Sequence, residues 1–396
     1  MKVALIGVAA LGLVMGCGAG AADKPANTAG SANAGNGGAG LAAGSGGMAA
    51  GGGQGQSGSS MGGAAAGSGA GGGAGGGSGA GTAGSGGSGG SGTQGFTCPA
   101  GAVDAPKLTG LTPMRVVGVP PADDFNNNNN DTTNIEGPVW VGDALYVSEI
   151  NFTKPNPPPA RVLKITASGQ VSIAIAADSG TNGLAINPAG ELFGALHKDG
   201  SISKLSLSGG AATPVVSMFM GKRFSSPNDL AFHTNGTLYF SDPKWQAPAP
   251  NPQTAMRAYR VAPGSSEAVV IEELDQPNGM TLSKNQDFLY IGGNQLKKYP
   301  VMADGTVGAG TTFVQGGSTD GMAIDCADNL YTTGNGVTVY SPAGAPIGTI
   351  SVNGLSSVTN VAFGGADHKT LYITSQGNKD QKGLWQVAMN IPGMPY

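Results

Sequence analysis

The stretch Asp320-Gly-Met-Ala-Ile324, followed by Leu330-Tyr-Thr332, consists of two short apolar runs separated by a turn, and the chain repeats this pattern. Each copy opens with an acidic residue or an asparagine, and the intervals between successive openings are 46, 46, 50, 42 and 40 residues. A period of roughly 40–50 residues built from short strands is typical of β-propeller blades. The sequence therefore predicts an all-β, six-bladed β-propeller. The copies open at Glu136, Asn182, Asn228, Asn278, Asp320 and Asn360.

Within each period, the apolar runs and tight turns predict four antiparallel strands. In the first blade we expect strands at 138–141, 144–148, 161–166 and 171–176. The last blade has only three such segments, near 360–364, 370–375 and 383–389. We expect residues 114–119, which precede the first blade, to supply the missing strand, so that both ends of the domain share one blade.

The N-terminal part of the chain differs in composition from the rest. Residues 1–16 contain one lysine and an apolar run too short to span a bilayer, which indicates a secretory signal peptide. The segment ending at Cys17 resembles the bacterial lipoprotein box, in which the cysteine is acylated; plain secretion is the alternative. Residues 17–97 are almost wholly Gly, Ala and Ser, which predicts a lipidated cysteine followed by a flexible linker. We therefore expect an exported protein anchored in the cell envelope, with the propeller in residues 98–396.

The charge and the remaining cysteines limit the partners and the redox state. The formal net charge is −4 and the basic residues form no stripe, so nucleic acid is not an expected partner. Nothing in the sequence indicates an oligomer, so we expect a monomer that touches a membrane only through its anchor. Thiols of exported proteins tend to oxidise. We expect Cys98 and Cys326 to form a disulfide that ties the start of the domain to the fifth blade; two unpaired, buried thiols are the alternative.

The six opening residues define the predicted functional site. Each precedes the innermost strand of its blade, so their side chains should ring one mouth of the central channel. Two carboxylates and four amides form a set of hard oxygen ligands that suits Ca²⁺ first and Mg²⁺ or Mn²⁺ second, whereas Zn²⁺ normally recruits His or Cys. Asn and Asp are also common in turns, but a turn does not explain Glu136 at the same register. The loops after the second strands should rim this mouth with Glu149, Asn151, His197, Lys198, residues 242–245, Asn294, Asn335 and Gln376.

Several of these phrases, taken together, resemble the SMP-30/gluconolactonase/regucalcin family of six-bladed propellers, in particular its bacterial gluconolactonase-like members. The similarity runs from about residue 135 to residue 392 and keeps the family's order and spacing. The phrases that carry it are Glu136-Gly-Pro-Val-Trp140, Gly221-Lys-Arg-Phe-Ser-Ser-Pro-Asn-Asp229, Gly236-Thr-Leu-Tyr-Phe-Ser-Asp-Pro243, Pro277-Asn-Gly-Met-Thr281, Thr319-Asp-Gly-Met-Ala323 and Thr359-Asn-Val-Ala-Phe-Gly-Gly365.

The resemblance implies roles for individual residues. Glu136, Asn278 and Asp320 match the family's metal-binding acid, amide and acid, and Asp320 also matches the carboxylate proposed as the general base. Asn228 matches an amide that contacts the substrate or the metal. Asn182 and Asn360 are equivalent by the repeat and are expected to contact the substrate. Family members often carry a histidine where His197 stands. Trp245 lies in a loop that departs from the family pattern; we expect it to stack on a sugar ring, and packing within its loop is the alternative.

The activity that the resemblance implies is opening of a sugar lactone, with a divalent cation polarising the carbonyl and water attacking it. The family uses the same metal site for other lactones and for phosphotriester-type esters. The rim loops of this chain depart from the family pattern at Lys244-Trp-Gln246 and at residues 155–159. The substrate is therefore open. The main alternative from another class is a surface protein without catalytic activity, in which calcium braces a propeller that binds a partner.

Overall fold

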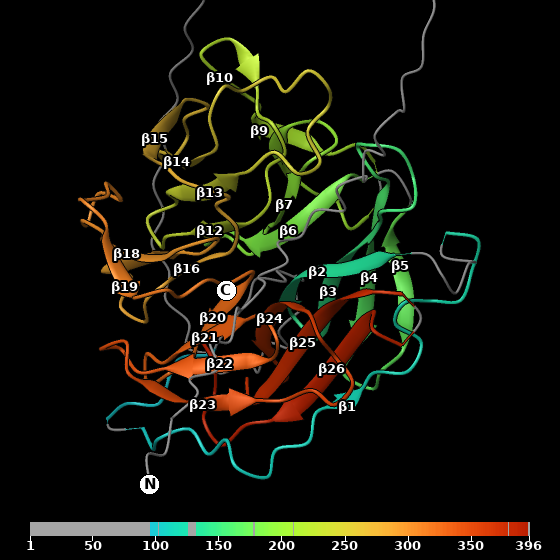
Figure 1. Cartoon of the computed structure of the whole chain (residues 1–396), viewed down its shortest axis with the longest axis vertical. Coiled ribbons are helices and arrows are strands. Elements are labelled where there is room, and N and C mark those ends of the chain that lie inside the picture. The colour runs from blue at the N-terminus through green and yellow to red at the C-terminus, as the bar shows by residue number, and fades with distance from the viewer. Residues whose placement is uncertain are drawn as a thin grey trace, which may run out of the picture. The chain divides into compact units, whose positions relative to one another are not determined.

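The computed structural model describes residues 96–101, 103–125, 132–176, 179–208, 210–378 and 380–394. The expected signal peptide, the lipidation site Cys17 and nearly all of the linker lie outside the described residues, so they stay predictions. The described residues form β-strands, turns and loops and no helix, so they contain no helical segment that could cross a membrane. Figure 1 shows β2, β6, β12, β16, β20 and β24, the innermost strands of six antiparallel blades, arranged around a common centre.

The first three blades follow one another along the chain. Blade 1 consists of β2 (Thr133–Val141), β3 (Ala144–Asn151), β4 (Ala160–Thr166) and β5 (Val171–Ile175). Blade 2 consists of β6 (Thr181–Ile186), β7 (Leu192–Leu196), β8 (Ser201–Lys204) and β9 (Thr213–Val216). Blade 3 consists of β12 (Leu230–Phe232), β13 (Leu238–Asp242), β14 (Arg257–Val261) and β15 (Ala268–Glu273). Between blades 2 and 3 lies a short hairpin of β10 (Met218–Phe219) and β11 (Lys222–Arg223).

The last three blades complete the ring. Blade 4 consists of β16 (Met280–Leu282), β17 (Phe288–Ile291), β18 (Leu296–Pro300) and β19 (Thr311–Val314). Blade 5 consists of β20 (Met322–Ile324), β21 (Leu330–Thr333), β22 (Val337–Tyr340) and β23 (Pro346–Ile350). Blade 6 consists of β24 (Val358–Gly364), β25 (Thr370–Gly377), β26 (Gly383–Ala388) and β1 (Met114–Arg115). The predicted six-bladed propeller is therefore confirmed.

Strands from both ends of the domain close the ring, as the sequence predicts. Met114 pairs with Gln386 and Arg115 with Trp385, so β1 is the outer strand of blade 6. It is shorter than expected: beyond Arg115 only one further backbone bond to β26 is formed, from Val116 N to Leu384 O at 2.8 Å. Because β1, the first strand of the chain, pairs with β26, the last, the ring cannot open without breaking blade 6.

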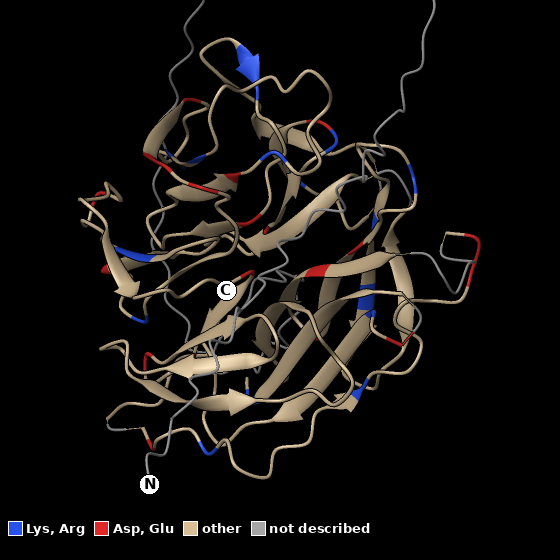
Figure 2. Ribbon diagram, in the orientation of Figure 1, with Lys and Arg blue, Asp and Glu red and all other residues tan. Residues whose placement is uncertain are grey.

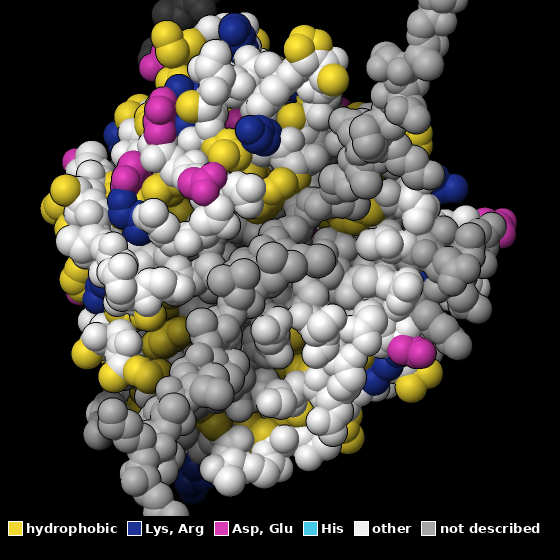
Figure 3. Space-filling view, in the orientation of Figure 1, with side chains coloured by type: hydrophobic (Ala, Val, Ile, Leu, Met, Phe, Trp, Pro, Cys, Tyr) yellow, Lys and Arg dark blue, Asp and Glu magenta, His cyan; other side chains and the backbone are white. Residues whose placement is uncertain are grey.

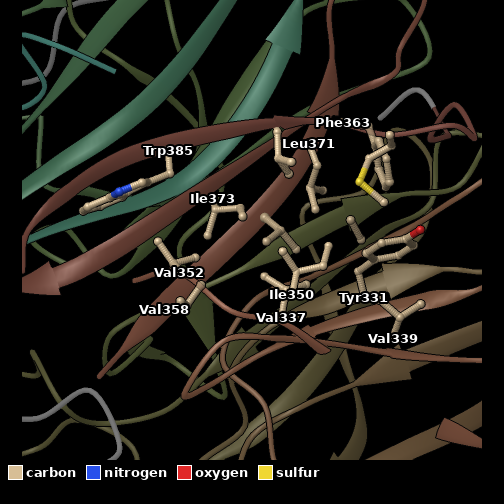
Figure 4. Packing of buried hydrophobic residues seen from close by; sticks show 14 residues of the cluster. Tyr331, Val337, Val339, Ile350, Val352, Val358, Phe363, Leu371, Ile373 and Trp385 are labelled. Atoms are coloured by element: carbon tan, nitrogen blue, oxygen red, sulfur yellow. The ribbon is translucent and has the colours of Figure 1, made fainter. Parts of the chain in front are cut away.

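The hydrophobic core is divided among neighbouring blades. Figure 4 shows one cluster in which Tyr331, Val337 and Ile350 from blade 5 face Phe363 and Ile373 from blade 6. All five are almost fully buried. Burying a large apolar side chain stabilises the fold by about 1.5–3 kcal/mol, so each blade depends on its neighbours for its stability.

A disulfide fixes the first described residues against blade 5. Cys98 and Cys326 are bonded, with their Cα atoms 5.3 Å apart and a sequence separation of 228. Cys326 follows β20 and is fully buried, whereas Cys98 belongs to no strand. Next to it, Phe96 stacks on His368 of blade 6, with the ring centroids 4.3 Å apart. The N-terminal segment therefore spans blades 5 and 6.

We expect Cys98→Ser to lower the free energy of unfolding by about 2–4 kcal/mol, because the disulfide restricts a long loop in the unfolded chain. Cys98 is the better position to change, since a substitution there leaves the buried Cys326 site without a new cavity. Urea unfolding of wild type and variant, with and without a thiol reductant, measures the effect. Reductant should bring the wild type to the stability of the variant and leave the variant unchanged; a wild type insensitive to reductant would contradict the role given to this bond.

Candidate functional site

The opening residues of the six repeats occupy equivalent places in the six blades. Asn228, Asn278 and Asp320 lie two residues before β12, β16 and β20, as expected. In blades 1, 2 and 6 the innermost strand begins earlier, and the opening residue lies inside it at an irregularity of pairing. These shifts fall between Glu136 and Val139, between Thr181 and Leu184, and between Val358 and Val361. Such bulges release a residue from the ladder and let its side chain turn toward the axis.

The residue after most openings is a glycine that contacts the next blade. Gly183 N donates to Asn228 O at 2.6 Å, and Gly279 N donates to Asp320 O at 3.1 Å. A Cβ on Gly183 would lie 2.6 Å from Asn228 O, and one on Gly321 would collide with the side chain of Asn360. Only glycine permits this approach. The repeated Asn-Gly and Asp-Gly pairs therefore bring the opening residues of neighbouring blades together.

The carboxylates of Glu136 and Asp229 are buried, that of Asp320 is half-buried, and the three are close enough to interact. Glu136 is 4 % exposed, and its pKa is raised well above the ordinary value, first by burial and then by the negative charges of Asp320 and Asp229. The N–H of Gly137 and the side chain of Asn360 oppose this shift by hydrogen bonding to Glu136. Buried like charges are unfavourable unless a cation compensates them. This arrangement fits a bound divalent cation.

Asp229 is a site residue that the sequence analysis missed. It stands where four other blades have glycine, and burial raises its pKa to about 7. Its two carboxylate oxygens accept hydrogen bonds from Leu230 N at 2.9 Å and from Met280 N, in blade 4, at 3.1 Å. An acidic residue at a position that is glycine in four other blades is the sequence signal that could have revealed Asp229.

Amide oxygens complete the ring. Asn182 Oδ1 and Asn278 Oδ1 are buried and have no hydrogen-bond partner in the described part of the chain, although buried polar atoms are normally paired. Asn228 is 5 % exposed. Asn360 Oδ1 instead accepts a bond from Val361 N at 2.8 Å, so Asn360 orients Glu136 rather than offering a free oxygen.

The donor set suits a hard cation. The described residues contain no group of three or more His, Cys, Asp and Glu side chains arranged for a metal, so a cation here would depend on the amides as well as on Glu136 and Asp320. Carboxylate and amide oxygens are the ligands that Ca²⁺ prefers, and Asn278 Oδ1 is an unpaired amide oxygen that such a cation would satisfy.

Asp242 supports the segment that leads into Asn228. It is fully buried, and its Oδ2 and Oδ1 accept hydrogen bonds from Ser225 N at 3.0 Å and Ser226 N at 2.8 Å. Burial raises its pKa to about 7, and the two N–H groups oppose this shift. We expected Asp242 to rim the mouth; it lies instead behind the segment and fixes its backbone.

Glu149, another residue expected at the rim, is also enclosed. Its carboxylate is buried and accepts a bond from Arg161 Nε at 2.6 Å, and Arg161 binds Asp123 at 2.7 Å. Glu149 therefore joins the 120–125 segment to blade 1, through Arg161, rather than facing the channel.

Elsewhere the charged residues are scattered over the blades, as Figure 2 shows, and in Figure 3 both signs of charge are interspersed on the face shown.

Three loops meet on the mouth side of blades 1 to 3. His197, after β7, is fully buried, and its Nε2 donates to Pro158 O in the β3–β4 loop at 2.8 Å. Asn156 of that loop donates through Nδ2 to Trp245 O, after β13, at 3.3 Å. Trp245 is half-buried. These two candidate substrate contacts thus belong to one connected group of loops.

His197 is held in its neutral form. Burial lowers its pKa to about 4, and the charge of Arg223 adds to this shift. Since Pro158 O can only accept, Nε2 carries the proton and Nδ1 has a lone pair with no partner in the described residues. Such a group accepts a hydrogen bond well and is a poor general base at neutral pH.

A cavity of about 250 Å³ approaches the ring from within the channel. Gly137, Asp229 and Asn360 line it at the ring, and most of the other lining residues near the ring are apolar, among them Leu184, Leu230, Met280 and Met322. Polar residues line it as well, namely Asn187, Thr234, Thr281, Ser283 and Gln286. On the channel side the carboxylates of the ring therefore face mainly apolar side chains, which strengthens electrostatic interactions among them.

Comparison with known proteins agrees with this geometry. Residues 135–377 match the family described as SMP-30/Gluconolactonase/LRE-like region. The gluconolactonase of Zymomonas mobilis is 28 % identical over 278 residues, covering 61 % of this chain and 76 % of the relative. The pentonolactonase of Haloferax volcanii is 29 % identical over 139 residues, covering 32 % of this chain and 47 % of the relative.

Solved structures share the fold. A gluconolactonase from Xanthomonas campestris has a TM-score of 0.56 at 23 % identity, covering 74 % of this chain and 100 % of its own. A calcium-binding protein, regucalcin, from Agrobacterium tumefaciens has a TM-score of 0.54 at 18 % identity, covering 68 % of this chain and 95 % of its own.

The raised pKa of Asp242 predicts a specific pH dependence of stability. Between the unfolded pKa of 3.8 and the folded pKa of about 7, the folded state binds a proton that the unfolded state has lost, so stability conferred by Asp242 falls as pH rises. Relative to Asp242→Asn, which cannot titrate, the wild type should lose up to about 4 kcal/mol of unfolding free energy over this window, at about 1.4 kcal/mol per pKa unit.

Urea unfolding of both proteins at pH 4 and at pH 7.5, in chelator, measures this difference. Asp143→Asn, at an exposed turn between β2 and β3, is the matched control and should show no such change. A constant difference between wild type and Asp242→Asn across the window would contradict the assigned burial.

Proposed function

The chain belongs to the SMP-30/Gluconolactonase/LRE-like family, and we propose that it is a metal-dependent hydrolase that opens a sugar lactone. The observation that carries the proposal is the ring in which the carboxylate of the buried Glu136 interacts with that of Asp320 and the buried Asn278 Oδ1 lacks a partner among the described residues. The Zymomonas mobilis relative, a gluconolactonase, points to a lactone as the substrate.

We assign the metal position to Glu136, Asn278 and Asp320, with Asn228 beside them. Ca²⁺ is the first candidate, because the donors are hard oxygens and because the regucalcin neighbour is described as calcium-binding; Mg²⁺, Mn²⁺ and Zn²⁺ are tested beside it. A divalent cation held there would supply Lewis acidity to the lactone carbonyl oxygen.

The residues of the chain would then do the following. Asp320 accepts a proton from the attacking water as the oxygen of that water bonds to the carbonyl carbon. The bond from this carbon to the ring oxygen breaks, and the ring oxygen takes the proton that Asp320 had accepted, which yields the hydroxy acid and returns Asp320 to its ionised form. Asn228 and Asn182 orient the substrate, and Asn360 holds Glu136 in place by a hydrogen bond. The surrounding apolar side chains limit access of bulk water to the carboxylates.

We further propose that the protein works as an exported monomer, anchored through Cys17, on a small neutral substrate rather than on nucleic acid. A propeller without catalytic activity, braced by calcium, is the outcome that the experiment below separates from an enzyme.

The test is hydrolysis of D-glucono-1,5-lactone by the purified protein in a pH-stat, as prepared, after chelation, and after return of each cation. Asp320→Asn should lower kcat/KM by at least about 10²-fold, because it removes both a general base and a ligand charge. The exposed Asp143→Asn is the control and should keep full activity.

Thermal unfolding of the same proteins separates binding from catalysis. Ca²⁺ should raise the melting temperature of the wild type, and the rise should be lost in Asp320→Asn. A rise with no turnover of any lactone would leave a structural cation and refute the hydrolase proposal; turnover that survives chelation would refute the metal.

A further inference from the structure

Gln246, in the β13–β14 loop, has an unexplained environment. Its side chain is 1 % exposed, and neither the amide oxygen nor the amide nitrogen has a hydrogen-bond partner in the ranges that the structure describes. An unpaired buried polar group costs about 1–3 kcal/mol, and Gln246 has two such atoms in one side chain. A group of this kind calls for a polar ligand.

The backbone of this loop is fixed next to the ring. Gln246 N donates to Ser226 Oγ at 3.4 Å, and Ser226 Oγ in turn donates to Pro243 O at 3.3 Å. Ser226 is two residues before Asn228, in the segment that Asp242 holds from behind. Gln246 is therefore anchored at the mouth where the ring residues lie, and not on an outer edge of blade 3.

Two other unpaired acceptors occur on the adjoining blade. His197 Nδ1 and Asn182 Oδ1, both of blade 2, are buried without partners in the described residues. The loops that carry His197 and Gln246 are linked, because Pro158 O accepts from His197 and Asn156, two residues earlier, donates to Trp245 O. Gln246, which can donate and accept, thus lies in a loop linked to that of His197, whose Nδ1 can only accept, and Asn182 Oδ1 is a further unpaired acceptor on blade 2.

We propose that Gln246, together with His197 and Asn182, forms a subsite that binds the hydroxyl groups of a polyhydroxylated ring. The inference rests on the proposed function and adds the determinant of its substrate class. None of the three groups carries a charge in its buried form, which suits a neutral polyol. An apolar lactone or a phosphotriester has no hydroxyl donors and would leave all three groups unpaired, and such mismatches are strongly discriminating.

The orientation of the bound ring follows from the same atoms. His197 Nδ1 and Asn182 Oδ1 require donors, so two ligand hydroxyls point their hydrogens toward blade 2. Gln246 can accept from one hydroxyl and donate to its neighbour, which matches adjacent hydroxyls on a sugar ring. Trp245, half-buried and next in sequence, offers a flat apolar surface for the ring.

The test compares two lactones of equal ring size in wild type and Gln246→Leu. D-Glucono-1,5-lactone carries hydroxyl groups and δ-valerolactone carries none. We expect the variant to raise KM for the first by about 10-fold or more, which corresponds to loss of one or two hydrogen bonds. Its kcat/KM for δ-valerolactone should be unchanged or higher. Gln170→Leu, at an exposed turn of blade 1, is the matched control.

A binding measurement keeps this inference separate from the proposed function. Calorimetry with 1,5-anhydro-D-glucitol, a ring polyol that cannot be hydrolysed, should show binding to the wild type and to Gln170→Leu but not to Gln246→Leu. If the wild type opens no lactone, this loss of binding still supports the subsite. An unchanged KM for gluconolactone in Gln246→Leu, equal losses for both lactones, or no binding of the polyol by the wild type would each overturn it.

Discussion

The close approach between the innermost strands of neighbouring blades is the constraint on which the rest of the molecule depends. Where Gly183 and Gly279 donate to the carbonyl of the next opening residue, no side chain fits between the two backbones. These contacts set the radius of the ring and so the distance between opposing side chains. A site built from six blades is possible only because each blade is held to the next at the point where its functional residue emerges.

Blade 3 meets the same constraint in a different way. Asp229 replaces the glycine, and its carboxylate accepts from Met280 N, so a side chain now provides the link between blades 3 and 4. This places a third carboxylate beside Glu136 and Asp320. The fold thus gathers carboxylates in a region that is largely buried, and a cation in the proposed site would relieve the repulsion that results. Structural closure and the proposed cation site therefore involve the same residues.

The repeat in the sequence was enough to predict the number of blades, the strands and the closure of the ring by residues near Met114, because these follow from a fixed period and from local turn chemistry. It also predicted which residues open each blade. It could not predict that Glu149 is neutralised by Arg161, or that Asp242 lies behind Asn228, since both depend on the packing of loops distant in sequence. The unpaired state of Gln246 was hidden for the same reason. The period of the sequence therefore identifies the six opening residues of the site, whereas contacts between loops distant in sequence determine which residues rim its mouth.

The rim loops have the composition needed to hold polar groups without partners. The β3–β4 loop includes Pro157, Pro158 and Pro159, and the β13–β14 loop includes Pro248, Pro250 and Pro252. Proline restricts the backbone in the unfolded chain as well as in the folded one, so ordering such loops costs less conformational entropy. That saving can offset part of the cost of burying unpaired amide and imidazole atoms. A ligand that supplies the missing hydrogen bonds then gains nearly all of their binding free energy, because these loops have already lost the conformational entropy that binding would otherwise remove.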